Sequence, residues 1–260
     1  MSSGSVPSPT VLVLTSGGFN PNMLINGLFR SFPGLRVVEE QPESKSVLLK
    51  RRIRRFGYVN AAGQLATMVL SRFGKRFAED RIQAIAREHG LSGERDPRVP
   101  VDHVESLNDA AAHALVARLK PAVVVTVSCR ILSKATLAAI PCPVINLHSA
   151  INPAYRGQMG GYWALVSGDR DNFGSTIHLV DEGVDTGAVL HQVRTTPARG
   201  DSMWTYPALL TAISVDPMRQ AVEDAIHGTL KPTQATGPSH LWFNVPIWTW
   251  LYHGLTKGIW

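Results

Sequence analysis

The sequence predicts an α/β fold with a doubly wound, mostly parallel sheet, and three observations support this prediction. Residues 11–14 are a short apolar run of the kind that forms a buried parallel strand. The Thr-Ser-Gly-Gly sequence at 15–18 follows as a tight turn into a helix. Two further β-branched runs, at 122–127 and 144–147, are typical of central strands.

The segment after the glycine turn predicts the first helix. Asn20 is expected to cap it, with Pro21 at the first helical position, where a missing N–H is tolerated. Leu24 and Leu28 then share the face that would cover the sheet. Strand, glycine turn and helix in this order are the beginning of a Rossmann-like fold.

The region before the first central strand predicts two more strands and two more helical segments. Strands are expected at 35–39 and 99–104, and a helix should start at Asn108 and stop before Pro121. Residues 44–89 predict a basic helical stretch with breaks at three glycines, namely Gly57, Gly63 and Gly74.

The second half of the chain predicts two later strands and a helical region. The strands are expected at 174–180 and 188–193, on either side of an acidic loop at 181–187. Residues 202–227 are expected to be mainly helical, with interruptions at two prolines.

A short helical, Trp-rich extension at 201–260 is expected to follow a main domain at 10–200, with a disordered Ser/Pro-rich lead-in at 1–9. Four of the six tryptophans lie within 241–260. These aromatic side chains suit packing on the core, a homodimer interface or a contact with a membrane surface, and all three alternatives stay open.

Positive charge is concentrated in one stretch of a chain whose formal net charge is +6. No Asp or Glu occurs within 45–76, which holds nine basic residues: Lys45, Lys50, Arg51, Arg52, Arg54, Arg55, Arg72, Lys75 and Arg76. Such a stretch attracts phosphate groups, nucleic acid or anionic lipid, or it is simply a solvated helix face. Apolar residues interleave with the charges near helical spacing, so the segment also suits peripheral contact with a membrane.

Other features favour a cytoplasmic protein. Cys129 and Cys142 are too few and wrongly spaced for a disulfide framework or a zinc site. No apolar run reaches the roughly 18 residues that span a bilayer, and residues 1–9 lack the features of a signal peptide.

Asn146, His148 and Asp185 are the candidate catalytic residues. Asn146 and His148 lie two apart on a predicted strand, so they face the same side, at the carboxyl end where open α/β sheets bind ligands. An amide donates a hydrogen bond to an oxyanion, an imidazole carries a proton, and a nearby carboxylate stabilises the imidazolium. Together with His178, His148 and Asp185 also make a conceivable two-His-one-carboxylate metal site, although no metal is expected.

The order of several motifs resembles the folate-dependent formyltransferases, which include glycinamide ribonucleotide, methionyl-tRNA and amino-sugar N-formyltransferases. The resemblance covers residues 123–192, with the motifs SCRILS, VINLHSAINPAYRG, GYWAL and GSTIHLVDEGVDTG. It implies that 10–200 is the catalytic domain and that 10-formyltetrahydrofolate is the donor co-substrate.

The resemblance also assigns binding roles. The pterin of the donor would bind to two segments, represented by Arg130, Ile131, Leu132, Val180, Asp181 and Glu182. Tyr155, Arg156, Gly157 and His178 are the substrate-binding candidates, with Arg156 also suited to bracing the loop. Packing in the core remains an equal alternative for Ile131 and Leu132, and a structural hydrogen bond for His178.

Departures from the family pattern bear on the acceptor. Pro21 removes an N–H near the turn that grips a ribose phosphate in purine-pathway members. Methionyl-tRNA enzymes carry a further β-rich domain of about a hundred residues, whereas only about 65 residues follow Val193. We therefore expect a small primary amine as acceptor, such as a nucleotide-linked amino sugar or a glycan or secondary-metabolite precursor, with a phosphate that the basic stretch would suit.

Three alternatives compete with this function. A formyltetrahydrofolate hydrolase would use the same donor without an amine. A catalytically silent binding protein would keep the fold alone. An RNA-binding protein is suggested only by the basic stretch, and no nucleic-acid partner is expected because no aromatic-rich RNA-binding motif is visible.

Overall fold

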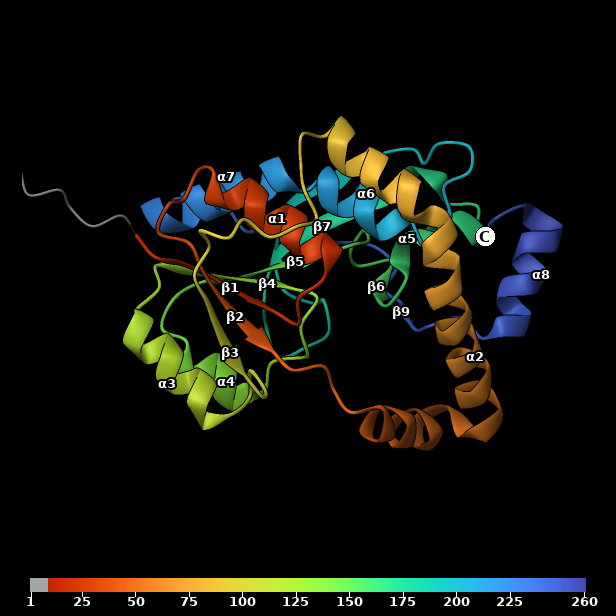
Figure 1. The fold of residues 1–260 in the computed structure, drawn as a ribbon, viewed down its shortest axis with the longest axis horizontal. Coiled ribbons are helices and arrows are strands. Elements are labelled where there is room, and N and C mark those ends of the chain that lie inside the picture. Colours follow the sequence, from red (N-terminus) through yellow and green to blue (C-terminus); the bar gives the residue numbers. More distant parts are fainter. Residues whose placement is uncertain (1–8) are drawn as a thin grey trace, which may run out of the picture.

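The computed structural model describes residues 9–260, without the side chains of Lys45 and Lys75, and the lead-in expected at 1–9 falls outside them except for its last residue. A seven-stranded sheet in the order β3-β2-β1-β4-β5-β7-β8 forms its centre (Figure 1). The strands are β1 (Val11–Thr15), β2 (Arg36–Glu40), β3 (Val101–Val104), β4 (Val123–Val127), β5 (Val144–His148), β7 (Gly174–Leu179) and β8 (Val189–Arg194). The first five run parallel, while β7 and β8 are antiparallel to their neighbours. This arrangement confirms the predicted doubly wound, mostly parallel α/β fold.

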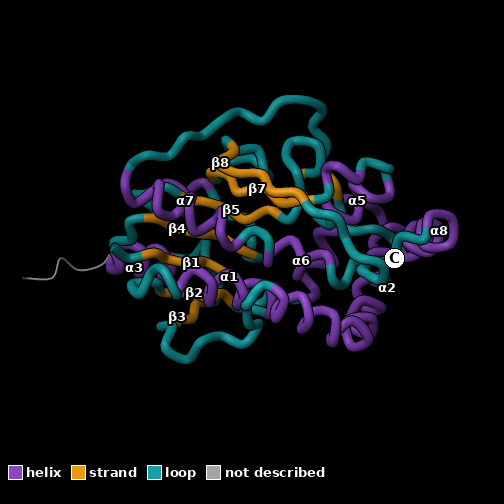
Figure 2. The backbone as a smooth tube through the Cα atoms, turned by 90° about the horizontal axis from the view of Figure 1, so that it is seen from above, coloured by secondary structure: helices purple, strands orange, loops and turns teal. Residues whose placement is uncertain are grey.

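Helices cover both faces of this sheet. They are α1 (Phe19–Phe29), α2 (Lys45–Glu88), α3 (Ala110–Leu119), α4 (Lys134–Ala139), α5 (Gly160–Val166), α6 (Tyr206–Ala212), α7 (Val215–His227) and α8 (Ile247–Lys257), with a 3₁₀ turn at Arg170–Asn172. In Figure 1, α1 and α7 lie on one face, and α3 and α4 on the other. Figure 2 shows the same sheet from above. Helices α2, α5 and α8 gather at one end of the molecule.

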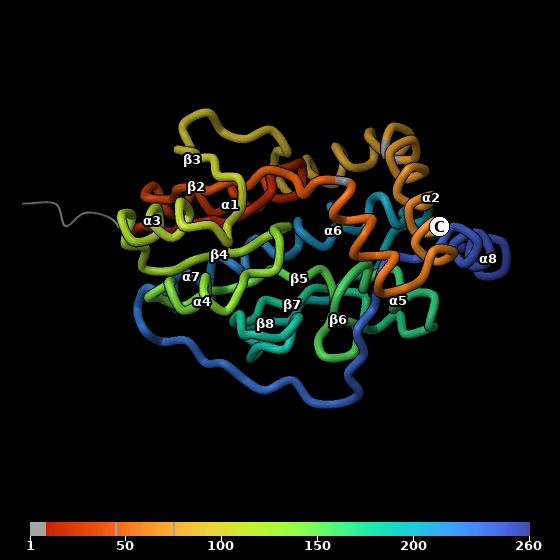
Figure 3. The backbone as a smooth tube through the Cα atoms, turned by 90° about the horizontal axis from the view of Figure 1, so that it is seen from below, coloured from red at the N-terminus to blue at the C-terminus, as the bar shows by residue number. Residues whose placement is uncertain are grey.

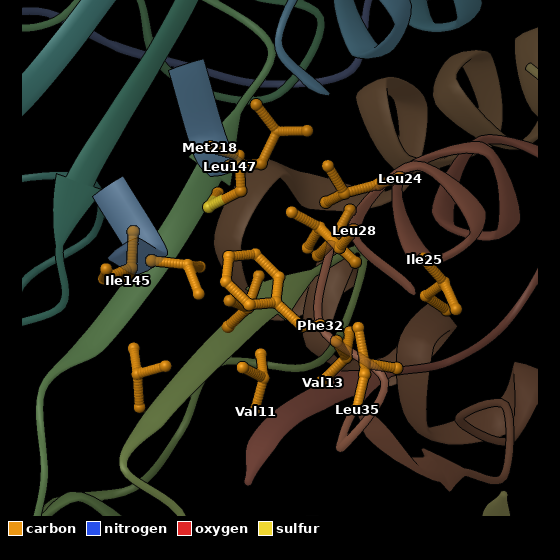
Figure 4. Close-up of a cluster of buried hydrophobic side chains, with 14 of the residues drawn as sticks. Val11, Val13, Leu24, Ile25, Leu28, Phe32, Leu35, Ile145, Leu147 and Met218 are labelled. Atoms are coloured by element: carbon orange, nitrogen blue, oxygen red, sulfur yellow. The ribbon is translucent and has the colours of Figure 1, made fainter. Parts of the chain in front are cut away.

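Alternate residues of β1 enter two different cores, because side chains of a strand point to opposite faces. Val11 and Val13 pack with Leu28 of α1 and Met218 of α7 (Figure 4). Leu12 instead faces the cluster that includes side chains of α3 and α4. Burying a side chain of this size stabilises the fold by about 1.5–3 kcal/mol. Burial on both faces explains why the strand is a continuous apolar run.

Two expected helix starts were wrong by one or two residues. Helix α1 begins at Phe19 after an N-cap at Gly18, so Asn20 lies inside the helix. Helix α3 begins at Ala110 after Asp109. The Asn108 side chain instead donates to the Ile131 carbonyl and accepts from the Ser133 N–H. Its polar atoms therefore stabilise a neighbouring loop rather than a helix end.

Only one of the three glycines expected to break the basic helix does so. Gly57 has φ of 75° and kinks α2. Gly63 and Gly74 stay helical, and each lies beneath a tryptophan ring. A Cβ on Gly63 would lie 2.3 Å from Trp248, and one on Gly74 would lie 2.2 Å from Trp204. These glycines therefore make room for aromatic rings. The positions of glycines in the sequence do not by themselves reveal this role.

The C-terminal region returns to the sheet and then packs on α2. After α7 the chain runs along β8, where Thr233 bridges Val189, and β9 (Leu241–Trp242) pairs with β6 (Arg156–Gly157) (Figure 3). Trp250 of α8 is buried in a third hydrophobic cluster, which also contains side chains of α2, α5 and α6. Within residues 9–260, no helix combines the length and apolar character needed to cross a membrane.

A double-mutant cycle tests the glycine–tryptophan contact in α2. Gly74→Ala should lower the free energy of unfolding by about 1–3 kcal/mol, because the new methyl group collides with the Trp204 ring. In a Trp204→Ala background the same change should stabilise the protein by about 0.5–1 kcal/mol, since alanine is the better helix former. Urea unfolding of the four proteins gives both values. Equal effects in both backgrounds would contradict the contact.

Candidate active site

A cavity of about 540 Å³ lies at the carboxyl ends of β4 and β5. Its lining combines residues 128–132, the end of β5, the 157–162 segment and most of the 180–185 loop with side chains of α6. The cavity therefore lies where open α/β sheets bind ligands. Its volume is in the range of small-molecule sites.

The three candidate catalytic side chains meet in this cavity. Asp185 reaches over from its loop, with Oδ2 3.5 Å from His148 Nδ1 and Oδ1 3.5 Å from Asn146 Nδ2. The Gly157 N–H donates to Asp185 Oδ2 at 2.9 Å. One carboxylate thus contacts side chains of β5 and the backbone of β6.

Hydrogen bonds fix the orientation of His148. Its Nε2 lies 2.8 Å from the Tyr155 carbonyl oxygen. Because a carbonyl only accepts, the proton of the neutral imidazole belongs on Nε2, which leaves Nδ1 free to accept a proton on the side of Asp185. His148 is therefore held in a state that suits a base.

Asn146 is held by a second set of contacts. Thr126 Oγ1 donates to Asn146 Oδ1 at 2.8 Å, and Asn146 Nδ2 donates to His178 Nε2 at 3.1 Å. The Nδ1 of His178 donates to the Leu179 carbonyl at 2.7 Å. These bonds assign the amide, so that its NH₂ group points into the cavity near Asp185. Thr126 was not among the sequence candidates, although it pairs with Asn146 in the β4–β5 register.

Burial and charge act in opposite directions on this group. Burial lowers the pKa of His148 below its usual 6.5, although the Asp185 carboxylate opposes the shift. Burial alone would raise the pKa of Asp185, but the neighbouring His148, the His178 ring and the Gly157 N–H lower it to about 2. At neutral pH the site therefore holds an ionised carboxylate next to a neutral imidazole.

Left-handed backbone conformations border the cavity. Ser128, Met159 and Asp185 all line it, with φ of 48°, 58° and 52° respectively. Such conformations cost non-glycine residues about 1–3 kcal/mol each and persist where surrounding contacts fix them. For Asp185 those contacts are the hydrogen bonds of its own carboxylate.

The expected substrate-binding element mostly supports the site from behind. Gly157 lines the cavity, whereas Tyr155 and Arg156 do not. The Tyr155 hydroxyl donates to Asp169, and Arg156 donates to the Val184 carbonyl at 3.1 Å. Arg156 thus braces the loop that carries Asp185. Of the four expected substrate-binding residues, only Gly157 and His178 border the cavity.

Two segments form the wall where the donor was expected. Residues 130–132 line the cavity together with Val180 and Asp181. Glu182 does not line it and instead pairs with Lys134 at the surface. That ion pair links the two segments outside the cavity.

A buried carboxylate beneath this wall was not predicted from the sequence. Glu40, at the end of β2, has a fully buried side chain. It accepts hydrogen bonds from the N–H groups of Arg130 and Leu107 and from the hydroxyl of Ser16. Glu40 therefore anchors the start of the 130–132 segment. The only sequence signal was an acidic residue ending a buried strand.

The same side chains are not arranged to hold a metal. Within the described part of the chain, no group of three or more His, Cys, Asp or Glu side chains is placed to hold a metal ion. His148, His178 and Asp185 are therefore not arranged as the two-His-one-carboxylate site considered from the sequence.

Solved structures of several formyltransferases share this fold. A sugar N-formyltransferase from Shewanella sp. FDAARGOS_354 matches 90% of this chain and 76% of its own, with a TM-score of 0.56 and 14% identity. Glycinamide ribonucleotide transformylase 1 from Symbiobacterium toebii matches 90% of this chain and all of its own, with a TM-score of 0.54 and 20% identity.

Sequence comparison finds relatives with higher sequence identity. A methionyl-tRNA formyltransferase from Desulfotalea psychrophila is 32% identical over 158 residues, which are 61% of this chain and 46% of that protein. One from Sorangium cellulosum is 39% identical over 105 residues, 40% of this chain and 33% of that protein. The chain thus spans less than half the length of these relatives. The family model described as "Formyl transferase" matches residues 78–210, about half of the chain. This chain therefore belongs to the formyl transferase family.

Proposed function

We propose that the protein transfers a formyl group from 10-formyltetrahydrofolate to a primary amine of a small molecule. The observation that supports this most is the convergence of Asn146, His148 and Asp185 in one cavity. A nucleotide-linked amino sugar, or a precursor of a glycan or secondary metabolite, is the acceptor class we favour. In this proposal residues 10–200 form the catalytic domain and 201–260 the C-terminal extension.

The chemistry follows from the positions of the three side chains. The amine nitrogen attacks the formyl carbon, and the carbonyl oxygen becomes an oxyanion that the Asn146 NH₂ group stabilises. His148 Nδ1 accepts the proton that the amine loses, and the imidazolium is stabilised by Asp185. The bond between the formyl carbon and N10 of the folate then breaks, N10 takes up the proton, and tetrahydrofolate leaves with no covalent enzyme intermediate.

The wall at 130–132 and 180–181 fits a flat heterocycle. Leu132 and Val180 contribute apolar surface to the cavity. Ile131 is 70% exposed although it is apolar, as expected for a side chain that a bound ligand covers. Glu40 would keep this segment in position. The charged tail of a folate would extend past this wall toward solvent.

Two kinds of relative bear on the choice of acceptor. Relatives named methionyl-tRNA formyltransferase and structures named sugar N-formyltransferase both resemble this chain. This chain covers 46% and 33% of the two methionyl-tRNA formyltransferases compared above. Formylation of methionyl-tRNA is therefore one of the outcomes that the experiment distinguishes. A hydrolase and a silent binding protein are the other outcomes.

Turnover of the donor distinguishes these functions. Tetrahydrofolate release would be measured with no acceptor, with a panel of nucleotide-linked amino sugars and other amines, and with methionyl-tRNA. We expect release that requires a small amine and yields its N-formyl product by mass spectrometry. His148→Ala, Asn146→Ala and Asp185→Asn should each slow it by about 10²–10⁴-fold.

His103→Ala is the matched control, because this exposed histidine lies on β3 at the far edge of the sheet. It should retain normal turnover. Release without an acceptor would identify a hydrolase, and formylation of methionyl-tRNA alone would identify a tRNA enzyme. Donor binding without turnover would identify a binding protein.

The pKa of His148 predicts how activity depends on pH. Burial lowers this pKa below 6.5, so the imidazole is neutral and able to accept a proton at neutral pH. Activity should then fall only as the pH drops through the lowered pKa. We expect kcat at saturating amine to be flat above pH 6.5 and to decline below it. An acid limb centred at or above pH 7 would contradict a neutral base in the resting enzyme.

A further inference from the structure

Helices α2 and α8 expose apolar side chains along their outer surfaces. On α2, Leu65, Val69, Phe73 and Phe77 recur every four residues, and Phe77 is 90% exposed. On α8 the exposed residues follow helical spacing: Trp248, Leu251, Tyr252 and Leu255. The two rows are adjacent, because Trp248 packs on Gly63 of α2. We call these eight residues the outer face.

The outer face lies at one end of the molecule, and basic residues accompany it. Figures 1 to 3 agree in placing α2 and α8 together at this end. No acidic residue occurs in α2 before Glu79. In this part of α2, before Glu79, six of the described basic side chains are exposed: Lys50, Arg51, Arg54, Arg55, Arg72 and Arg76. Arg51 is paired with Glu43.

We propose that the outer face binds an anionic lipid bilayer, with α2 and α8 lying on the membrane surface. An exposed apolar row flanked by arginines is the arrangement of interfacial helices, whose apolar side chains enter the headgroup region while cations attract anionic lipid. Tyr252 and Trp248 are the residue types that favour this interface. The helices described at 9–260 do not qualify as membrane spans, which agrees with a protein that lies on the bilayer.

Charge disfavours a second copy of the chain as the occupant. A two-fold dimer through this face would bring the same α2 surface of both copies together, and with it Arg72 and Arg76 of each copy. Like charges brought together in this way repel each other. An anionic surface satisfies the apolar row and the cations at once. Nucleic acid would use the cations but would leave most of the apolar row in water.

Hydrogen bonds connect α8 and the chain just before it to the segment at 162–163, beside the cavity. The Tyr162 hydroxyl, on a residue that lines the cavity, lies 2.8 Å from His253 Nδ1 on α8. Trp163 Nε1 donates to the Phe243 carbonyl, just before α8. Binding of α8 to a membrane would therefore hold the cavity next to lipid headgroups.

Vesicle flotation of the full chain tests the proposal, with vesicles of phosphatidylcholine alone or mixed with phosphatidylglycerol. No folate is present, so the result is independent of the proposed formyl transfer. We expect flotation only with the anionic vesicles, and its loss at high salt because salt screens the attraction. Failure to float with the anionic vesicles would overturn the proposal.

Paired variants separate charge from apolar insertion. Lys50→Glu with Arg54→Glu should weaken the partition coefficient at least about tenfold, since each basic residue contributes about fivefold. Lys120→Glu with Lys231→Glu is the matched control, because these exposed lysines change the net charge equally but lie outside α2 and α8. Equal loss in both pairs would mean a nonspecific charge effect and would overturn the proposal.

Phe73→Ser with Phe77→Ser should also release the protein from vesicles while circular dichroism and thermal unfolding stay near those of the parent, because both side chains are exposed. Light scattering measures the oligomeric state of the parent and of this variant. A parent dimer that this variant converts to a monomer, with no vesicle binding in either, would assign the face to self-association instead.

Discussion

The carboxylate of Asp185 is the interaction on which the candidate site depends. It lies within 3.5 Å of His148, Asn146 and His178, and it accepts a hydrogen bond from Gly157. These partners belong to three strands, β5, β6 and β7, whereas Asp185 lies in a loop. Asp185 itself adopts a left-handed backbone, and Arg156 holds the loop through Val184. This carboxylate therefore adds to the contacts with Tyr155 and Thr126 that already orient His148 and Asn146.

A second carboxylate, that of Glu40, constrains the scaffold around the cavity. Two carboxylates position parts of the cavity: Asp185 contacts the candidate catalytic side chains of β5, and Glu40 anchors the 130–132 wall. Glu40 is fully buried and Asp185 is mostly buried, and each accepts a hydrogen bond from a backbone N–H, which lowers the cost of burying the charge. Asp185 lines the cavity directly, and the 130–132 segment and side chains of α6 also line it. Polar groups that are fixed in advance can stabilise charge that develops in a transition state without the cost of reorganising.

Periodicity and turn residues were sufficient to predict the seven strands of the central sheet, but not the short strands β6 and β9. Asn146 and His148 share a face because strand side chains alternate, and that follows from the sequence alone. The approach of Asp185 does not, since it depends on the path of a loop. For Glu40 the sequence shows only an acidic residue at the end of a buried strand, and its role was not predicted because its partners come from three other segments. Gly74 was misjudged for the same reason: its role depends on a tryptophan 130 residues away in the chain.

The most direct test of the Asp185–His148 contact is a nitrogen-15 NMR titration of His148 in the parent and in Asp185→Asn, with Glu182→Gln as the control. The account predicts a neutral Nε2–H tautomer, because the Tyr155 carbonyl accepts that proton. It also predicts a pKa below 6.5 that falls further in Asp185→Asn, because the opposing carboxylate charge is lost. Glu182→Gln should leave the pKa unchanged, since Glu182 pairs with Lys134. An Nδ1–H tautomer, or a pKa that Asp185→Asn does not lower, would contradict the account.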